Sequence, residues 1–164
     1  MAFFTTAVVD WRPVFSSLAC ANALLDQFQE TLDFHRLAAA AYVIMPSHLH
    51  ALIGFPEIEK LSSAVQSLKS LSARRIEPLL PKKLYDCLHT GGKYKLWRPR
   101  FDDLIIWSET QFRIKAEYIH NNPVRAGLID RAIDYPFSSA RDWLTDGHGP
   151  IPIDKDWTWQ RRDG

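Results

Sequence analysis

The stretch "YVIMPSHLHALIGF", residues 42–55, decides the fold. Apolar and β-branched residues fill both of its ends, and a Pro-Ser pair interrupts them at 46–47. This pattern predicts two strands, at 38–45 and 49–55, joined by a hairpin-like turn. A hairpin in the middle of the chain indicates an antiparallel sheet, around which the remaining elements must be arranged.

The segments on either side of the hairpin give the order β-α-β-β-α-β, followed by one more helix. We expect further strands at 3–11 and 103–107, and helices at 16–34, 62–79 and 109–121, because apolar residues recur there at the matching periods. Ser108 should cap the last helix and Pro123 should stop it. The order is that of the ferredoxin-like split βαβ unit. The predicted fold is therefore α+β, an antiparallel sheet with two helices on one face and an added C-terminal helix.

The rest of the chain is expected to be less regular. Residues 81–101 hold Gly91, Gly92 and mixed charges, which predicts a long loop, and loops of this length usually have a function. The last forty residues should form a short helix and a Trp-rich packing tail. No repeat or linker divides the sequence, so we expect a single domain over 1–164, with its core at about 3–143 and a tail at 144–164.

Composition excludes several classes of protein. With 46% hydrophobic residues among 164, the chain can bury a core of its own. No apolar run approaches the roughly 20 residues of a membrane span, and the N-terminus lacks the basic region of a signal peptide. Cys20 and Cys87 are not spaced as metal ligands. We therefore expect a reduced, cytoplasmic protein that makes no contact with a membrane.

Positive charge is concentrated in one part of the chain. Residues 60–101 hold ten basic residues against two acidic ones, a net charge of +8, whereas the whole chain carries +1. Such polarity is typical of a surface that binds a polyanion, although a solvated basic face without a partner is the alternative. Aromatic residues lie among these charges, which favours nucleic acid, in particular a single strand, over an acidic protein. The candidate DNA-binding residues are Arg74, Arg75, Lys93, Lys95, Trp97, Arg98 and Arg100.

These seven candidates form two groups with different expected roles. The arginines and lysines should touch phosphates, whereas Trp97 should stack on a base. The alternative for Trp97 is a place in the protein core.

The two histidines of the opening stretch form a candidate metal site. Side chains alternate across a strand, so His48 and His50 should share one face while Leu49 points to the other, toward the helices. Neutral imidazole is a good ligand for Mn²⁺, Zn²⁺ and related ions. The spacing alone is weak evidence, because any two histidines at i and i+2 satisfy it, and a purely structural role is the alternative.

A second motif, "AEYIHNNPVRAG", places Tyr118 and Asn122 four residues apart at the end of the last helix, on one face. Asn122 could simply cap the helix end. If that helix packs on the open face of the sheet, however, Tyr118 and Asn122 could meet His48 and His50. A metal ion there could polarise a phosphodiester while the tyrosine oxygen attacks phosphorus.

"MPSHLH" followed by "YIHNNPVRAGLIDRAIDYPFSSARDW" resembles the REP-associated tyrosine transposases, part of the single-tyrosine transposase group of bacterial insertion sequences. "AVQSLKSLSARRI" and "LWRPRFDDLII" are similar to middle segments of that family, so the resemblance runs from about residue 3 to 143. It implies that His48 and His50 are metal ligands in a His-hydrophobic-His (HUH) motif. It also implies that Tyr118 is the nucleophile, and that Asn122 stands where related transposases have a Gln that completes the metal site.

The resemblance further implies a metal-dependent endonuclease and strand transferase, using Mg²⁺ or Mn²⁺, that acts on single-stranded or hairpin DNA of repetitive extragenic elements. A 5′-phosphotyrosine intermediate would make a nucleotide cofactor unnecessary. A bacterial, nucleoid-associated monomer or homodimer is expected. The chain departs from the family at Ser47, where Asp or Asn is frequent, and residues 81–95 and those after 143 match no family pattern.

Three alternatives remain open from the sequence. The chain could be a DNA-hairpin-binding protein that no longer cuts. It could be another HUH nuclease, such as a relaxase or a rolling-circle initiator, although its short length and "NNPVRAG" helix disfavour this. It could also be a small metal-binding protein unconnected to DNA, against which the basic segment argues.

Overall fold

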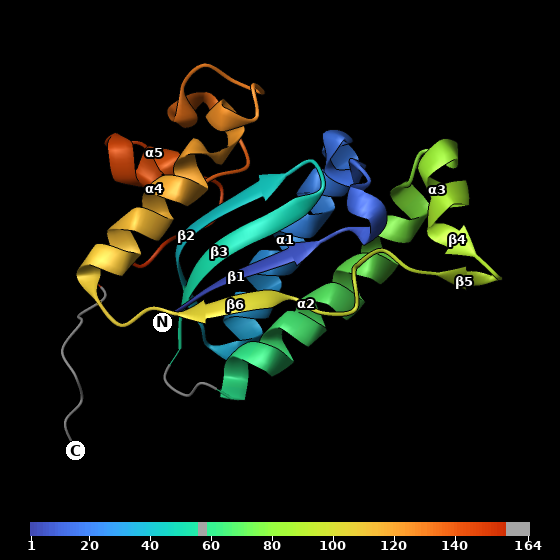
Figure 1. The fold of residues 1–164 in the computed structure, drawn as a ribbon, viewed down its shortest axis with the longest axis horizontal. Helices are drawn as coiled ribbons and strands as arrows, with labels where there is room; N and C mark the ends of the chain where they lie inside the picture. The colour runs from blue at the N-terminus through green and yellow to red at the C-terminus, as the bar shows by residue number, and fades with distance from the viewer. Residues whose placement is uncertain (56–58, 157–164) are drawn as a thin grey trace.

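The protein is described by a computed structural model that covers residues 1–55 and 59–156. The sheet and its packed helices are β1 (Ala2–Ala7), α1 (Leu18–His35), β2 (Ala38–Met45), β3 (His48–Gly54), α2 (Glu59–Ile76), β6 (Asp102–Ile105) and α4 (Glu109–Arg125). The strands follow the order β2-β3-β1-β6, and every neighbouring pair is antiparallel. This is the order expected of the ferredoxin-like unit, and the predicted α+β fold is confirmed (Figure 1).

Helices cover both faces of the sheet. α1 and α2 pack against each other on one face, and α4 lies across β2 and β3 on the other (Figure 1). The alternation along β3 fits this arrangement, because Leu49, Ala51 and Ile53 belong to the core beneath α1 and α2, whereas Leu52 belongs to the core beneath α4. The predicted orientation of the hairpin is therefore correct.

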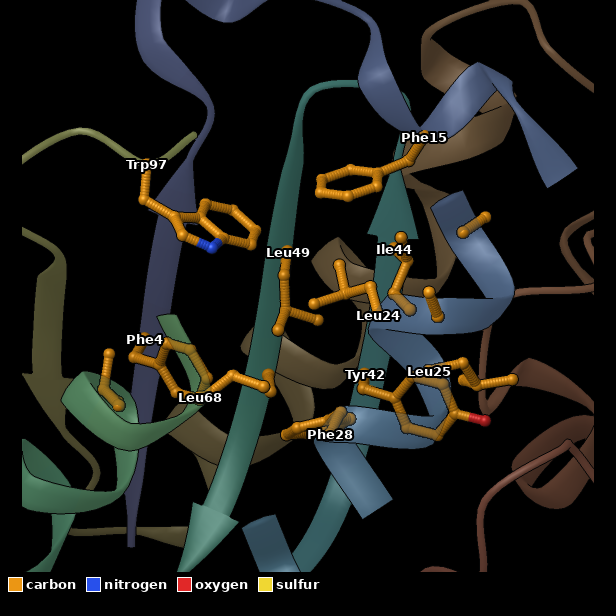
Figure 2. Close-up of a cluster of buried hydrophobic side chains, with 14 of the residues drawn as sticks. Phe4, Phe15, Leu24, Leu25, Phe28, Tyr42, Ile44, Leu49, Leu68 and Trp97 are labelled. Carbon is orange, nitrogen blue, oxygen red and sulfur yellow. The ribbon is translucent and has the colours of Figure 1, made fainter. Parts of the chain in front are cut away.

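The larger core lies between the sheet and the two helices α1 and α2. Phe4 and Leu49 from the strands meet Leu24 and Phe28 of α1 and Leu68 of α2 (Figure 2). Each of these side chains is almost fully buried. Burial of such side chains contributes about 1.5–3 kcal/mol each, so this core fixes the strand that carries the two histidines.

Several predicted boundaries shift by a few residues, and the two largest differences are at the end of the first strand and at the end of the last helix. The first strand stops at Ala7, and residues Val9–Trp11 form a short 3-10 turn, η1, in which Asp10 and Trp11 have φ angles of 54° and 53°. Pro123 does not stop α4, because a proline in the last turn removes only one backbone donor. Gly127, with a φ of 70°, follows the end of that helix. Ser108 caps α4 as predicted, accepting a hydrogen bond from the Gln111 amide.

The predicted loop at 81–101 is partly ordered. It contains a short helix, α3 (Lys82–Leu88), and a two-stranded hairpin of β4 (His89–Thr90) and β5 (Lys93–Tyr94). Gly91 and Gly92 have positive φ angles and form its turn. The prediction failed because these elements are too short to leave a periodic pattern. The unit projects beyond the end of the sheet farthest from α4 (Figure 1).

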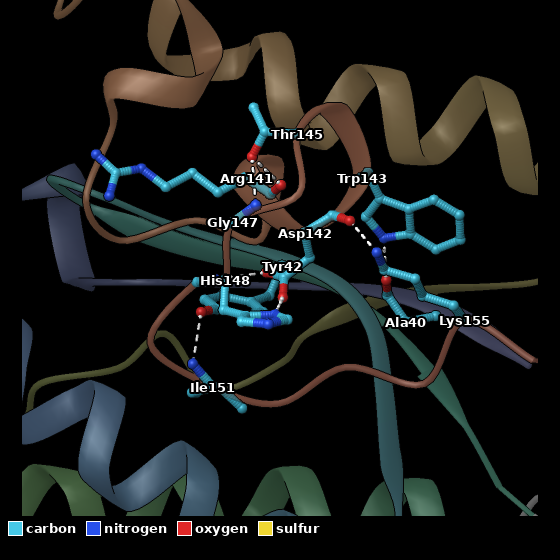
Figure 3. A network of polar contacts seen from close by, with 11 residues as sticks. Ala40, Tyr42, Arg141, Asp142, Trp143, Thr145, Gly147, His148, Ile151 and Lys155 are labelled. Atoms are coloured by element: carbon cyan, nitrogen blue, oxygen red, sulfur yellow. Dashed lines mark hydrogen bonds and ion pairs between the residues drawn. The ribbon is translucent and has the colours of Figure 1, made fainter.

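The C-terminal residues are tied to β2. The 3-10 turn η4 (Ala132–Asp134) and the helix α5 (Ala140–Leu144) follow α4. Trp143 donates its indole N–H to the Ala40 carbonyl, and the buried Tyr42 hydroxyl accepts from the Ile151 amide (Figure 3). Lys155 donates to the Asp142 carbonyl. The short helix and packing tail are thus as predicted up to residue 156, while the end of the Trp-rich tail, 157–164, lies outside the described residues.

Among residues 1–55 and 59–156, none of the helices combines the length and the apolar character that a membrane span requires.

Candidate active site

The two imidazoles of β3 lie side by side. The ring centroids of His48 and His50 are 4.6 Å apart, on the face of the sheet that α4 covers. Thr5, which pairs with His50 across the β1–β3 ladder, places its hydroxyl 2.6 Å from His50 Nδ1. The Ser47 hydroxyl lies 3.1 Å from His48 Nδ1. Each hydroxyl oxygen can accept from Nδ1–H, which leaves both Nε2 lone pairs for a metal ion.

Both histidines are held in the neutral form. Burial lowers the pKa of His48 to about 4. Burial is also the main reason that the pKa of His50 falls to about 3, with smaller contributions from the charges of His48 and Lys115. A neutral imidazole is the form that binds a divalent ion, so the pair is ready to act as a ligand at neutral pH.

α4 brings Tyr118 to this pair. The tyrosine ring centroid lies 5.3 Å from that of His50. The ring of Phe3 on β1 stacks on that of His50, with centroids 5.5 Å apart, and makes an edge contact with the ring of Tyr118 at 6.1 Å. Phe3 therefore packs against both rings. Tyr118 and His50 are 68 residues apart in sequence, and only the packing of α4 on the sheet unites them.

Two cations flank the tyrosine. Lys115 Nζ lies 5.6 Å from the centre of the Tyr118 ring, and the Arg125 guanidinium carbon lies 5.8 Å from it. Asn122 occupies the same side of α4 as Tyr118, one helical turn further on, and is half-buried. Positive charge on both sides of a phenol favours the approach of a phosphate to its oxygen.

The donor atoms present fit a divalent metal ion bound through nitrogen and oxygen. In the described part of the chain, no group of three or more His, Cys, Asp and Glu residues gathers around a point. The further donors to a His48–His50 site would therefore be oxygens, and the Asn122 amide, on the same side of α4 as Tyr118, is a candidate. Oxygen-rich coordination suits Mg²⁺ and Mn²⁺ better than it suits Zn²⁺.

The predicted DNA-binding residues divide into separate groups. Arg98 and Arg100 line a hollow whose wall also includes Thr5 and Trp11, the residues that contact His50 and His48. Trp97 differs from the expected stacking role: it is 5% exposed, packs on Phe15 and donates its indole N–H to Ser72 (Figure 2). The burial of Trp97 favours the alternative, a core residue.

The other four basic candidates are not brought to the histidines. Arg74 and Arg75 lie at the end of α2, on the opposite face of the sheet, and Arg75 pairs with Glu30 of α1 at 2.9 Å. Lys93 and Lys95 lie on or just after β5, in the projecting hairpin unit. These residues remain candidates for contacts with more distant parts of a DNA ligand.

Several residues of the site were missed in the sequence. Lys115 and Arg125 could have been found, because they stand three residues before and seven after Tyr118 on the same helix face. Thr5 and Phe3 carry no such signal, since the register between β1 and β3 alone brings them to His50. Trp11, half exposed with its ring 5.4 Å from His48, was likewise not recognised.

A separate hollow of about 800 Å³ lies on the other side of α4, between that helix and the C-terminal segment. Phe112, Ala116 and Trp143 are among its lining residues. Because it faces away from Tyr118, it does not belong to the site at the histidines.

A ferredoxin-like sheet with two histidines on one strand and a tyrosine on a packed helix defines the class of single-tyrosine HUH transposases. Comparison with known proteins agrees. The family model described as "Transposase IS200 like" matches residues 6–122, a span that includes His48, His50, Tyr118 and Asn122. The chain belongs to the IS200-like transposase family, whose members cleave and join DNA, and the resemblance found in the sequence is confirmed.

Curated relatives carry the more specific name. A putative REP-associated tyrosine transposase of Haemophilus influenzae is 26% identical over 141 residues, 84% of this chain and 78% of the relative. The REP-associated tyrosine transposase of Escherichia coli K12 is 28% identical over 118 residues, 71% of this chain and 60% of the relative.

Two solved structures share the fold. One is a REP-associated tyrosine transposase bound to a REP hairpin, with a TM-score of 0.70 and 24% identity over 96% of this chain and 86% of that one. The other is a putative transposase from Deinococcus radiodurans R1, with a TM-score of 0.51 and 25% identity over 73% of this chain and 88% of that one.

Proposed function

We propose that the protein is a metal-dependent single-stranded DNA endonuclease and strand transferase that uses Tyr118 as its nucleophile. One observation carries this proposal. The centroid of the Tyr118 ring lies 5.3 Å from that of His50, and the centroid of the His48 ring lies 4.6 Å from that of His50. A nucleophile and a pair of neutral imidazoles therefore face the same point from two different elements.

The residues divide the reaction between them. The Tyr118 oxygen attacks phosphorus, a new O–P bond forms and the P–O3′ bond breaks, which leaves a 5′-phosphotyrosine and a free 3′-hydroxyl. The phenol loses one proton and the 3′ oxygen gains one, so the step is balanced. Lys115 and Arg125 attract the phosphate to the tyrosine. Attack by a 3′-hydroxyl on the phosphotyrosine reverses the step and joins strands without a nucleotide cofactor.

His48, His50 and Asn122 would hold a Mg²⁺ or Mn²⁺ ion, with the two Nε2 atoms and the amide oxygen as donors. When bound, this ion supplies Lewis-acid polarisation of the scissile phosphate. The hydroxyls of Thr5 and Ser47 keep both rings in the orientation that the ion requires.

We infer that the substrate is a DNA hairpin with a single-stranded flank, of the kind found in repetitive extragenic elements. The net charge of +8 over residues 60–101 favours a polyanion, and a structural neighbour was solved on such a hairpin. We further infer that the protein acts in the bacterial cytoplasm, at the nucleoid, as a monomer or a homodimer.

The test is a covalent-capture assay. The protein is incubated with hairpin oligonucleotides that carry single-stranded flanks and a label at the 3′ end, which stays on the fragment bound to Tyr118. The samples contain Mg²⁺, Mn²⁺ or EDTA and are then denatured. We expect a labelled protein–DNA adduct with either metal and none with EDTA, while binding to the hairpin persists. Binding without any adduct in any metal would identify a DNA-binding protein that no longer cuts.

A further inference from the structure

A second hollow adjoins the histidines. It has a volume of about 270 Å³ and is lined by Thr5, Ala7, Trp11, Arg98, Pro99, Arg100 and Asp102. Two of its lining residues also contact the proposed metal ligands. The Thr5 hydroxyl lies 2.6 Å from His50 Nδ1, and the centroid of the Trp11 ring lies 5.4 Å from that of His48. Whatever occupies this hollow is therefore next to a phosphate bound at the histidines.

Trp11 is presented to this hollow at a cost in backbone energy. Asp10 and Trp11 both have φ angles near +54°, a region that residues other than glycine seldom adopt. The Trp11 amide donates to the Val8 carbonyl at 3.0 Å, which holds the turn in place. Trp11 is nevertheless 52% exposed. A strained turn that exposes a large aromatic ring beside a reaction centre indicates a ligand for that ring.

The opposite wall is anchored to the core. The segment 96–100 runs beside the end of β1, where the Arg98 amide donates to the Ala7 carbonyl at 2.9 Å. Trp97 points inward and is buried, so Arg98 points outward. Lys69 of α2 donates its ammonium to the carbonyls of Arg98 and Pro99, at 2.7 and 3.1 Å. These bonds bring the Arg98 guanidinium carbon 5.7 Å from the centre of the Trp11 ring.

The chemistry of the lining suits one nucleotide of a single strand. An indole that is half exposed can stack on a base, and the guanidinium that lies over the same ring can pair with the phosphate that adjoins the base. Asp102 adds an acceptor, and a carboxylate accepts from the amino group of a base. A phosphate alone would leave the indole unused and would meet the negative charge of Asp102.

We propose that this hollow binds one unpaired nucleobase next to the cleaved phosphate, with the base stacked on Trp11, the adjoining phosphate on Arg98 and an amino group of the base on Asp102. The proposal rests on the proposed function, because it places the base relative to the phosphate that Tyr118 attacks. Adenine, cytosine and guanine carry an amino group and thymine does not, so the hollow discriminates against thymine.

The first experiment measures binding of hairpin oligonucleotides in which an abasic site is moved one position at a time along the flank. Tyr118→Phe protein is used, so that no covalent product forms. At one position the abasic site should weaken binding by roughly 5- to 150-fold, the range known for one stacked base. Trp11→Ala should weaken binding to intact DNA by the same factor and abolish the effect of the abasic site at that position.

Trp107→Ala is the matched control, because Trp107 is also an exposed tryptophan, at 78%, but lies outside the hollow. It should leave the abasic profile unchanged. If Trp11→Ala leaves every position of the profile unchanged, or if both tryptophan variants change it alike, the stacking assignment is overturned. A protein that forms the Tyr118 adduct and yet gives this result would retain the proposed function and lose only the base site.

The second experiment tests the edge of the base. With each of the four bases at the sensitive position, thymine should bind most weakly to the wild-type hollow. Asp102→Asn should reduce this difference, because an amide both donates and accepts. If the wild-type protein binds oligonucleotides with thymine and with cytosine at this position equally well, the role of Asp102 is overturned.

Discussion

The Tyr118 ring on α4 lies 5.3 Å from the His50 ring on β3, and Phe3 of the neighbouring strand contacts both. The contact brings together the two groups that the proposed reaction needs: the helix would supply the oxygen nucleophile, and the sheet would supply the nitrogen ligands. The phenol oxygen can be removed while the three rings remain in contact. A substitution of Tyr118 can therefore test the nucleophile without disturbing the packing.

Tyr118→Phe should therefore abolish the covalent adduct while leaving hairpin affinity within about twofold of wild type. Only the hydroxyl is lost, and the ring keeps its contacts with Phe3 and His50. Denaturing gels of labelled oligonucleotide measure the adduct, and a binding titration on the same samples measures affinity. An adduct that survives denaturation with this variant would assign the nucleophile to another residue.

Neighbouring residues of β3 should respond in opposite ways. His48→Gln and His50→Gln should remove metal-dependent adduct formation with a small change in stability. Leu49→Ala should lower the free energy of unfolding by about 2–5 kcal/mol, because Leu49 is fully buried beneath α1 and α2. Urea unfolding and the adduct assay on all three variants check this. If Leu49→Ala were harmless and the histidine variants unfolded, the assignment of functions to the two faces would be reversed.

The sequence predicted those residues that follow a period. The alternation of His48, Leu49 and His50 gives the two faces of β3 directly, and the four-residue spacing of Tyr118 and Asn122 gives one face of α4. Trp97 and Trp11 show the limit of prediction from periodicity. Trp97 belongs to no periodic segment, and Trp11 was assigned to a strand that in fact ends at Ala7. Their exposure is set by the pairing of residues 96–98 with the end of β1, a contact between segments almost ninety residues apart. Only the folded arrangement shows that Trp97 is inside and Trp11 outside.

Trp97→Ala should consequently act on stability. The side chain is 5% exposed and its indole N–H is bonded to Ser72, so its removal should cost about 3–5 kcal/mol of unfolding free energy. Ser72→Ala, which leaves the indole N–H unpaired, should cost about 1–3 kcal/mol. Thermal melts and urea titrations measure both. A Trp97→Ala protein that melts as wild type but loses DNA affinity would restore the stacking role expected from the sequence.

His89 should make the order of the projecting hairpin depend on pH. Its Nδ1 bonds to the Tyr85 carbonyl and its Nε2 to Glu77, and these contacts, the backbone one foremost, raise the pKa of His89 above its usual value near 6.5. A raised folded-state pKa means that the stabilisation is complete below pH 6.5 and is lost as pH rises through the folded value. Proteolysis at residues 82–95 should therefore accelerate at higher pH, and NMR titration of Glu77→Gln should give a lower pKa for His89. An unshifted titration in wild type would contradict this.

The salt dependence of binding should distinguish two arginines that the sequence treats alike. Arg98 has its guanidinium over Trp11, the ring that contacts His48, whereas Arg75 is paired with Glu30 on the face covered by α1 and α2. Each phosphate contact on a single strand contributes about 0.7 to the slope of log affinity against log salt. Arg98→Ala should flatten that slope by about this amount and weaken all hairpins alike, since phosphates carry no sequence information. Arg75→Ala should leave the slope unchanged, because its charge is already neutralised and lies across the sheet from Tyr118. Titrations of Tyr118→Phe protein at several salt concentrations measure both slopes, and a flatter slope for Arg75→Ala alone would place the DNA on the α1–α2 face instead.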